Sequence, residues 1–220
     1  NNIMDLVEDG RGDLWVATFA GGLARYDGQR FHRVDDAHDP GHRRTRALAP
    51  TPSGRLWIGT AGGGVSQYDG EVFQSLLRRD GLASNTVWEI TPTRSGAIWI
   101  VTDEGAQQYR PRDTPPMLQM TGIVADRRHV GNEQVVVSTL QELVSFEFNG
   151  VSFRTRPGEM VYRYRLDGYD PEWYQTRDTQ VEYVGLPAGD YLFSVQAINQ
   201  DLVRSKTVDA RLSVRPPYMR

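Results

Sequence analysis

The chain of 220 residues contains no cysteine. A disulfide framework, a thiolate metal site and a cysteine nucleophile are therefore excluded. Lysine is nearly absent too: Lys206 is the single one, and the other basic residues are arginines scattered along the chain. With a formal net charge of −3 and no basic cluster, the composition argues against nucleic acid as a partner. No apolar run reaches the length of a membrane-spanning helix, so we expect any membrane attachment to depend on a segment outside this chain.

What the chain does contain is a repeat with a period of 42 residues, marked by Trp15, Trp57 and Trp99. A glycine stands three residues before each tryptophan, and Tyr-Asp-Gly begins eleven residues after the first two. The third copy reaches Tyr109 one residue early and so carries a single deletion. A period of this size, with a tryptophan and small turn residues, predicts stacked four-stranded β-units. We interpret the tryptophans as structural residues wedged between neighbouring units.

The first copy divides into four predicted strands, at residues 3–7, 14–18, 23–26 and 31–34. Asp-Gly and Gly-Gly pairs between them provide the positive φ angles that tight hairpins require. The third copy is cut short by Pro111, Pro115 and Pro116, because proline cannot donate the hydrogen bonds of a fourth strand. The sequence thus predicts an all-β fold that begins with a partial β-propeller of three four-stranded blades, the third incomplete, over residues 1–113.

Residues 117–217 continue with alternating apolar and polar positions but without the repeat. Six short segments have this pattern: 133–137, 144–148, 161–166, 179–184, 191–199 and 208–214. Their number and spacing predict a β-sandwich of the immunoglobulin or fibronectin-III kind. Tyr191 follows Pro187 and Gly189 and opens a predicted strand, which is typical of a tyrosine corner.

The repeat resembles a known family. Its pattern, D-x-x-G-x-L/I-W-[IV]-x-T-x-x-G-[GA]-x-x-x-Y, is similar to the two-component regulator propeller repeat of bacterial sensor proteins. The first copy, from Asp9 to Tyr26, carries it most fully. The other two copies depart from the pattern at the leading acid, where Thr51 and Thr93 stand.

The second half resembles the three-Y domain. The resemblance lies in the run from Tyr162 to Trp173, in the turn 186–191 and in the terminal Arg-Pro-Pro-Tyr. The resemblance implies structural roles for Tyr162, Tyr164, Trp173, Tyr183 and Tyr191. The family's Asn-x-Asp-Gly turn is Asn-Gln-Asp-Leu here, at residues 199–202.

Propeller and three-Y domain occur in this order in the periplasmic part of bacterial sensor histidine kinases. The resemblance therefore implies the extracytoplasmic ligand-sensing and signal-transmitting region of a membrane-bound two-component sensor. The chain begins inside the repeat pattern, so we expect it to be a piece of a longer protein that also has a membrane helix and an output domain. We expect a homodimer, with a small molecule or an oligosaccharide as ligand and no cofactor.

The aligned copies also suggest a binding site. The slot on the innermost predicted strand holds Met4, Arg46 and Trp88, and the next slot holds Asp5, Ala47 and Glu89. Slots with a structural role stay constant between copies, whereas these vary. Arg46 and Trp88 would suit a sugar or a carboxylate, through stacking and charge-assisted hydrogen bonds. We therefore take Met4, Arg46, Trp88 and Glu89 as candidate ligand-binding residues; the alternative is that residues lining a channel simply vary because little packs against them.

Other functional classes find less support. Acidic and histidine side chains crowd residues 35–42, but Pro40 and Gly41 exclude helical metal-ligand spacing between His38 and His42, so we expect no metal site. The Arg-Gly-Asp at residues 11–13 falls in a hairpin turn. No catalytic residues have a spacing that enforces mutual geometry, and we expect no enzyme activity in this chain. A carbohydrate-binding propeller module and an enzyme similar to the streptogramin lyases are the alternatives.

Overall fold

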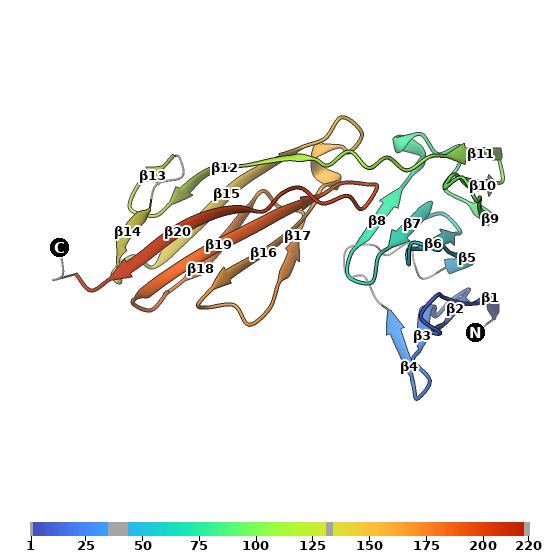
Figure 1. Cartoon of the computed structure of the whole chain (residues 1–220), viewed down its shortest axis with the longest axis horizontal. Helices are drawn as coiled ribbons and strands as arrows, with labels where there is room; N and C mark the ends of the chain where they lie inside the picture. The colour runs from blue at the N-terminus through green and yellow to red at the C-terminus, as the bar shows by residue number, and fades with distance from the viewer. Residues whose placement is uncertain (1, 35–43, 131–133, 218–220) are drawn as a thin grey trace. The chain divides into compact units, whose positions relative to one another are not determined.

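The computed structural model describes residues 2–34, 44–130 and 134–217 of the chain, in which nearly all regular structure is β-strand. The chain divides into two compact units, residues 1–113 and 114–220. The first contains strands β1 to β11 and the second contains strands β12 to β20 (Figure 1). The predicted all-β fold, a partial propeller followed by a sandwich, is confirmed.

The first unit consists of three antiparallel sheets, each formed by consecutive strands. The first sheet contains β1 (Ile3–Glu8), β2 (Leu14–Thr18), β3 (Gly22–Tyr26) and β4 (Phe31–Val34). The second contains β5 (Thr45–Pro50), β6 (Leu56–Thr60), β7 (Val65–Tyr68) and β8 (Phe73–Leu76). The third contains β9 (Val87–Pro92), β10 (Ile98–Thr102) and β11 (Gly105–Tyr109), and a short 3₁₀ turn, η2 (Arg78–Asp80), precedes it.

The three sheets share one register, which is why the sequence repeats. Trp15 lies opposite Val7, Trp57 opposite Ala49 and Trp99 opposite Thr91, each on the second strand of its blade. The glycine three residues before each tryptophan has a φ of 81° to 85° in the turn between the first two strands. Side chains other than glycine rarely adopt such an angle, so the turn geometry accounts for the glycine in every copy.

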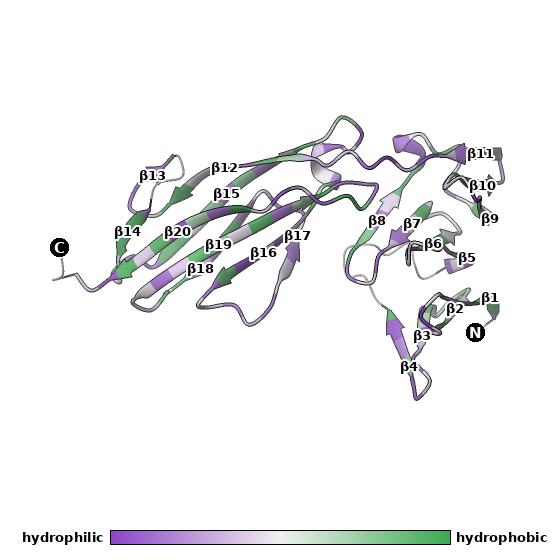
Figure 2. Ribbon diagram, in the orientation of Figure 1, coloured by the Kyte–Doolittle hydropathy of each residue, from purple (hydrophilic) through white to green (hydrophobic). Residues whose placement is uncertain are grey.

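The blades pack face to face through the tryptophans. Trp15 and Ala17 lie in one buried cluster with Leu56 and Ile58 of the next blade. Trp57 lies in a second cluster with Ile98 and Ile100. Figure 2 shows the corresponding apolar stretches on the blade strands. Because each blade uses one apolar face for each neighbour, both faces of its second strand are apolar in sequence.

The third blade ends after three strands. Its last strand, β11, has only β10 as a partner among the described residues, whereas β3 and β7 each pair with a fourth strand. Of the three tryptophans, Trp99 is 42% exposed while Trp15 is 3% and Trp57 is 1% exposed. The expectation that all three are wedged between blades therefore has to be corrected for Trp99, because no described strand covers that face of the third blade.

The second unit is a sandwich of two sheets. One has the strand order β13-β12-β15-β18 and the other the order β14-β20-β19-β16-β17. The strands of the first sheet are β12 (Met117–Val124), β13 (Arg128–His129), β15 (Leu143–Val151) and β18 (Gln180–Val184). Those of the second are β14 (Val135–Ser138), β16 (Val161–Asp167), β17 (Tyr174–Thr176), β19 (Gly189–Ile198) and β20 (Val208–Arg215), with a 3₁₀ turn, η3 (Pro157–Glu159), before β16.

Sequence periodicity missed part of this sandwich. Strand β12 pairs along most of its length with β15, yet its sequence, MLQMTGIV, does not alternate cleanly and follows two prolines. Strand β17 has three residues, too few for a pattern to emerge, and among the described strands it pairs only with β16. Strand β14 pairs in parallel with β20, a long-range pairing that no local signal reveals.

Buried tyrosines hold the turns of the sandwich. The ring of Tyr191 is buried, and its hydroxyl donates a hydrogen bond of 2.8 Å to the carbonyl of Pro187, as in a tyrosine corner. The hydroxyl of Tyr183 donates to Oδ2 of Asp170 at 2.6 Å. Tyr162 is fully buried and its hydroxyl accepts the N–H of Gly150 at 3.0 Å. Each polar tip is thus satisfied inside an apolar core, as burial requires.

The two remaining predicted structural residues lie nearer the surface. Tyr164 is partly buried, and its ring packs against Tyr174 and Phe193. Trp173 lies beneath the guanidinium of Arg163, whose carbon is 5.0 Å from the centre of an indole ring. Both therefore stabilise the sheet from its periphery.

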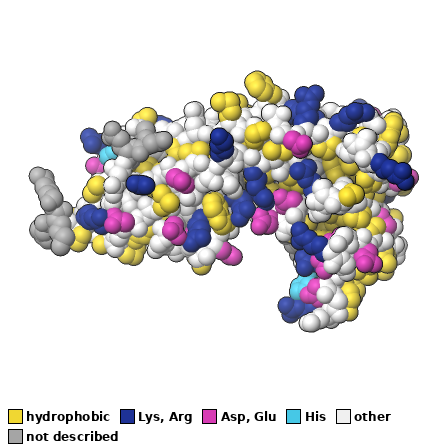
Figure 3. Space-filling view, viewed as in Figure 1, with side chains coloured by type: hydrophobic (Ala, Val, Ile, Leu, Met, Phe, Trp, Pro, Cys, Tyr) yellow, Lys and Arg dark blue, Asp and Glu magenta, His cyan; other side chains and the backbone are white. Residues whose placement is uncertain are grey.

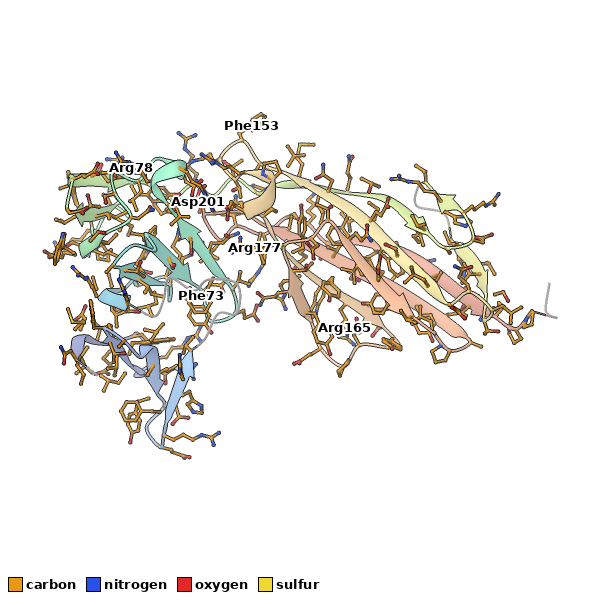
Figure 4. All side chains as sticks on the ribbon, turned by 180° about the vertical axis from the view of Figure 1, so that it is seen from behind. Phe73, Arg78, Phe153, Arg165, Arg177 and Asp201 are labelled. Atoms are coloured by element: carbon orange, nitrogen blue, oxygen red, sulfur yellow. The ribbon has the colours of Figure 1, made fainter. Side chains whose placement is uncertain are left out.

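The departure from the family turn at residues 199–202 has a structural consequence. Among the described residues, Leu202 is the one non-glycine residue with a positive φ, 58°. Its side chain is 5% exposed, so burial offsets the backbone strain. The adjacent Asp201 is buried and forms an ion pair of 3.1 Å with Arg154. Figure 4 shows Asp201 in the sandwich, near the segment after β15 in which Phe153 points outward.

Candidate functional site

The three residues in the variable slot occupy one unusual backbone position. On β1, Ile3 pairs with Thr18 and Asp5 with Ala17, so Met4 between them has no partner of its own. The same interruption of register falls at Arg46 on β5 and at Trp88 on β9. Each is the extra residue of a β-bulge on the first strand of its blade. A bulge redirects a side chain out of the alternation of its strand, and bulges are frequent beside functional sites.

The bulges of the second and third blades bring two candidate residues together. The guanidinium carbon of Arg46 lies 4.2 Å from the ring centre of Trp88, well within the distance of a cation–π contact. The same guanidinium carbon lies 5.8 Å from the ring centre of Phe19. Arg44 also approaches Phe19, at 6.0 Å. Among the first strands of the blades, β1 contacts β5 and β5 contacts β9. The side chains of Arg44, Arg46, Trp88 and Phe19 therefore form one cluster, which we call the bulge cluster.

The guanidinium of Arg46 is not fully hydrogen-bonded in this cluster. Nε and Nη1 of Arg46 are buried but have no hydrogen-bond acceptor in the described part of the chain. A buried donor without a partner costs free energy, whereas an incoming carboxylate or hydroxyl would satisfy it. Trp88 remains 54% exposed and offers a flat surface beside the charge. An aromatic face next to a guanidinium is suited to a sugar ring or an acidic group.

The other two candidates lie apart from this pair. Met4 occupies the equivalent bulge in the first blade and is 43% exposed. Glu89 pairs with Val101 and therefore lies on the same face of the third blade as Trp99. Its carboxylate accepts a hydrogen bond from the hydroxyl of Thr91 at 3.3 Å. The place of Glu89 in the ligand contact therefore stays a prediction, because its described contacts are with Thr91 and with the strand of Trp99.

Asp5 is the counterpart of Glu89 in the first blade. Its contacts show the role of this slot in a blade that has a further blade packed beside it. Its Oδ2 accepts the backbone N–H of Leu48 at 2.7 Å, which links β1 to β5 of the next blade. In the first blade, the second slot therefore serves the contact with the next blade.

Sequence reasoning missed Phe19 and Arg44. Both stand in slots that also vary between copies: Phe19 aligns with Ala61 and Asp103, and Arg44 aligns with Asn2 and Thr86. These slots lie at the start of the first strand and just past the end of the second. The same test of variability between copies would have found them if it had been applied beyond two positions.

The loop with the histidine and aspartate side chains, including Asp35, Asp36, His38, Asp39 and His42, lies outside the described residues. Elsewhere in the described ranges, no cluster of three or more histidine, aspartate or glutamate side chains could hold a metal ion. Those ranges also include no helix that is long and apolar enough to span a membrane. On the face drawn in Figure 3, arginine and acidic side chains are interspersed, without a large patch of one sign.

Comparison with protein families agrees with both halves of the sequence analysis. Residues 1–20 match the family model "Two component regulator propeller". Residues 155–216 match the family model "Y_Y_Y domain". Both resemblances are confirmed. No curated protein matches the chain.

A solved structure shares the fold. The extracellular domain assigned to a hybrid two component system of B. thetaiotaomicron superposes with a TM-score of 0.56 at 18% identity, over 98% of this chain and 32% of that one. The chain thus spans about a third of that structure's length. An extracellular domain assigned to a one component system of the same organism gives a TM-score of 0.42 at 15% identity, over 99% of this chain and 51% of that one. An inactive virginiamycin B lyase from Staphylococcus aureus gives 0.38 at 10% identity, over 92% and 83% of the two chains.

Proposed function

We propose that this chain is part of the extracytoplasmic, ligand-sensing and signal-transmitting region of a membrane-bound two-component sensor. The observation that carries the proposal is the order of the two matches, a regulator propeller repeat followed by a Y_Y_Y domain. The extracellular domain described above supports it through its fold, which matches over nearly the whole chain. In this proposal the propeller blades receive the signal and the sandwich passes it toward a membrane segment and an output domain outside this chain.

The ligand contact in this proposal is the bulge cluster. Arg46 is stacked on Trp88 at 4.2 Å, and two of its buried nitrogens have no hydrogen-bond acceptor among the described residues. A small molecule or an oligosaccharide with an acidic or hydroxyl group would stack on the indole and accept from the guanidinium. The same chemistry serves the alternative of a carbohydrate-binding propeller module, which would bind the sugar without passing a signal.

Location can be tested because the chain has no cysteine. In the full-length protein, with any cysteine outside this chain replaced, Phe153→Cys places a single thiol at a fully exposed position. We expect a membrane-impermeant maleimide to label it in intact spheroplasts. Labelling only after lysis would place the chain in the cytoplasm and overturn the proposal. Leu166→Cys, at a fully buried position, serves as the unreactive control.

Sensing can be tested with a transcriptional reporter of the full-length system in its native host, exposed to single polysaccharides. We expect one of them to induce the reporter, and Arg46→Ala to abolish that induction. Arg127→Ala removes the same charge at an exposed position of the sandwich and should leave induction unchanged. Full induction in Arg46→Ala would exclude the bulge cluster as the ligand contact; induction that is lost equally in both variants would also count against it.

We also propose that the chain has no catalytic activity of its own. In the bulge cluster, two aromatic rings lie beside two arginines, and none of its described residues is a general base or a nucleophile held in reacting geometry. A lyase of the streptogramin kind would need such groups to converge. Turnover of a streptogramin by the purified chain would contradict this part of the proposal.

A further inference from the structure

Two equivalent pockets lie between successive blades, beside the turns that join the first and second strands. The first is lined by Asp9, Trp15, Thr51, Arg55 and Tyr68, among others. The second is lined by Thr51, Arg55, Trp57, Thr93 and Arg94, among others. The period of 42 residues relates Asp9 to Thr51 and Trp15 to Trp57. The chain therefore contains the same pocket twice, with an aspartate at one position in the first copy and a threonine at that position in the second.

In the first pocket a carboxylate of the protein meets the tryptophan. Oδ2 of Asp9 accepts the indole N–H of Trp15 at 2.8 Å. Its Oδ1 accepts the backbone N–H groups of Arg11 at 2.8 Å and Asp13 at 3.1 Å. Partial burial opposes ionisation of Asp9, but the hydrogen bonds from Trp15 and from the backbone outweigh it and lower its pKa below the ordinary value. This corner of the blade is thus built to hold a negative charge.

In the second pocket the carboxylate is missing. Thr51 replaces it, and its hydroxyl remains within the turn, where it contacts Ser53 at 2.9 Å and the carbonyl of Arg55 at 3.0 Å. Trp57 has the register of Trp15 and the same edge contact with the tyrosine of the next blade: Trp15 lies 5.8 Å from Tyr68, and Trp57 lies 5.6 Å from Tyr109. Its indole is therefore directed at the turn in the same way.

Trp57 lines this pocket. Trp57 is 1% exposed, and its N–H donates no hydrogen bond within the described ranges of the chain. Two guanidinium groups, of Arg55 and Arg94, line the same pocket against one carboxylate, that of Asp113. Neither arginine forms an ion pair with another described residue, so the pocket has an excess of positive charge.

We infer that the pocket at Trp57 binds the carboxylate of a small acidic ligand, which takes the place that Asp9 occupies in the first blade. The ligand's oxygen would accept the indole N–H of Trp57, and Arg55 or Arg94 would balance its charge. A sugar acid fits this chemistry, since Thr51 and Ser53 add hydroxyl groups at the rim. This site differs from the bulge cluster and does not depend on the proposed sensing role.

The indole N–H signals of the protein provide a direct test. The chain has five tryptophans, so a two-dimensional ¹⁵N–¹H spectrum contains five indole signals, which sequential assignment distinguishes. Titration with sodium glucuronate should move the Trp57 signal downfield with saturation and leave the Trp15 signal in place. Glucose, which lacks the carboxylate, and sodium chloride at equal ionic strength should leave the Trp57 signal unmoved.

Thr51→Asp supplies the missing carboxylate from the protein itself. The Trp57 signal of this variant should lie downfield without ligand, and glucuronate should bind at least tenfold more weakly. Thr179→Asp adds the same charge at an exposed residue of the sandwich and should retain the response of the unchanged chain. The inference is overturned if glucuronate up to tens of millimolar leaves the Trp57 signal in place, or if glucose or chloride moves it equally. The titration of the unchanged chain decides the matter even if Thr51→Asp does not fold.

Discussion

Tyr191 combines a buried ring with a hydroxyl that is satisfied at a single place. The ring contacts the backbone near Gly168 and Gly189, and the hydroxyl reaches the carbonyl of Pro187 at 2.8 Å. Burial raises the pKa of Tyr191, so the neutral phenol that donates this bond persists across the physiological range. The residue thus fixes the turn that leads into β19, the central strand of its sheet.

Tyr191→Phe should lower the free energy of unfolding by about 1–3 kcal/mol, because the turn loses the hydrogen bond from the hydroxyl of the buried Tyr191 to the carbonyl of Pro187. Urea unfolding followed by circular dichroism measures the change. Tyr169→Phe is the matched control: Tyr169 is 49% exposed, and removing its hydroxyl should change stability by less than about 0.5 kcal/mol. Equal effects of the two substitutions would remove the tyrosine-corner argument.

Asp9 makes the stability of the fold depend on pH in the acidic range. Its pKa is lowered in the folded chain by the hydrogen bonds described above, in spite of partial burial. A carboxyl group whose pKa is lower in the folded than in the unfolded state stabilises the fold above its unfolded pKa, about 3.9, and loses that contribution as the pH falls through the folded value. Asp9→Thr, which copies the second blade, should therefore destabilise the chain at pH 7.

The difference in unfolding free energy between the unchanged chain and Asp9→Thr should shrink as the pH falls from about 4 through the lowered pKa of Asp9 in the folded chain, because the aspartate is then protonated in both states. Denaturant unfolding at a series of pH values measures it. Glu172→Gln, at an exposed residue of the sandwich, controls for the loss of a negative charge. A difference that stays constant from pH 7 down to pH 2 would show that Asp9 acts through packing and not through its charge.

At the scale of elements, the neighbouring blade decides whether the repeated tryptophan is buried. Trp57 and Trp99 occupy the same register on β6 and β10. Trp57 packs against Ile98, Ile100 and Tyr109 of the third blade, while Trp99 has no described blade beyond it. The exposed fractions, 1% and 42%, measure the effect of one neighbour. Because the local sequence is so similar, the two residues form a natural pair for comparison.

Trp57→Ala should lower the free energy of unfolding of the propeller unit by about 3–5 kcal/mol, the cost of removing a large buried aromatic side chain. Trp99→Ala should cost only about 1 kcal/mol or less at a protein concentration where the chain is monomeric, since exposed substitutions have small effects. Thermal and denaturant unfolding of both variants provide the comparison. Similar losses in both would mean that the blade contact does not explain the burial of Trp57.

At the scale of the whole molecule, the outermost blades leave complementary faces open. Tyr26 and Phe31 of the first blade pack together at 4.9 Å, and Phe31 is 64% exposed. The equivalent pair in the second blade, Tyr68 and Phe73, stacks at 4.2 Å, and Trp15 packs on its tyrosine. The face with Trp99 is the counterpart of the one that carries Trp15. Exposed apolar faces of this kind usually meet a partner.

We expect the isolated chain to form a dimer with two-fold symmetry, in which the Trp99 face of each copy meets the Tyr26 face of the other. Two such contacts would close a ring of six blades, within the range of known propellers. Light scattering at high micromolar concentration should give twice the chain mass, and Trp99→Arg should halve it. A monomer would exclude any dimer, and a dimer insensitive to Trp99→Arg would instead point to pairing through residues 117–217.

Local physics made much of the fold predictable from the sequence. The repeated Gly-x-x-Trp requires a positive φ in one hairpin turn and a large apolar side chain two residues into the next strand, so the blades follow from neighbouring residues. The run of prolines after Tyr109 determines the missing fourth strand, because it removes N–H donors from the backbone. The turn 186–191 likewise identifies the tyrosine corner, whose partners Tyr191 and Pro187 are close in sequence.

Tertiary structure decided what depends on distant neighbours. Arg46 and Trp88 could be aligned from the sequence, but only the bulges and the packing of β5 beside β9 bring them to 4.2 Å. Glu89, adjacent in sequence, lies on the same face of the third blade as Trp99. Trp57 and Trp99 stand in similar local sequences, yet Trp57 is buried and Trp99 is exposed. Burial depends on the next blade and not on the residue itself. Phe19 joins the cluster across a strand pair, a contact that no local pattern encodes.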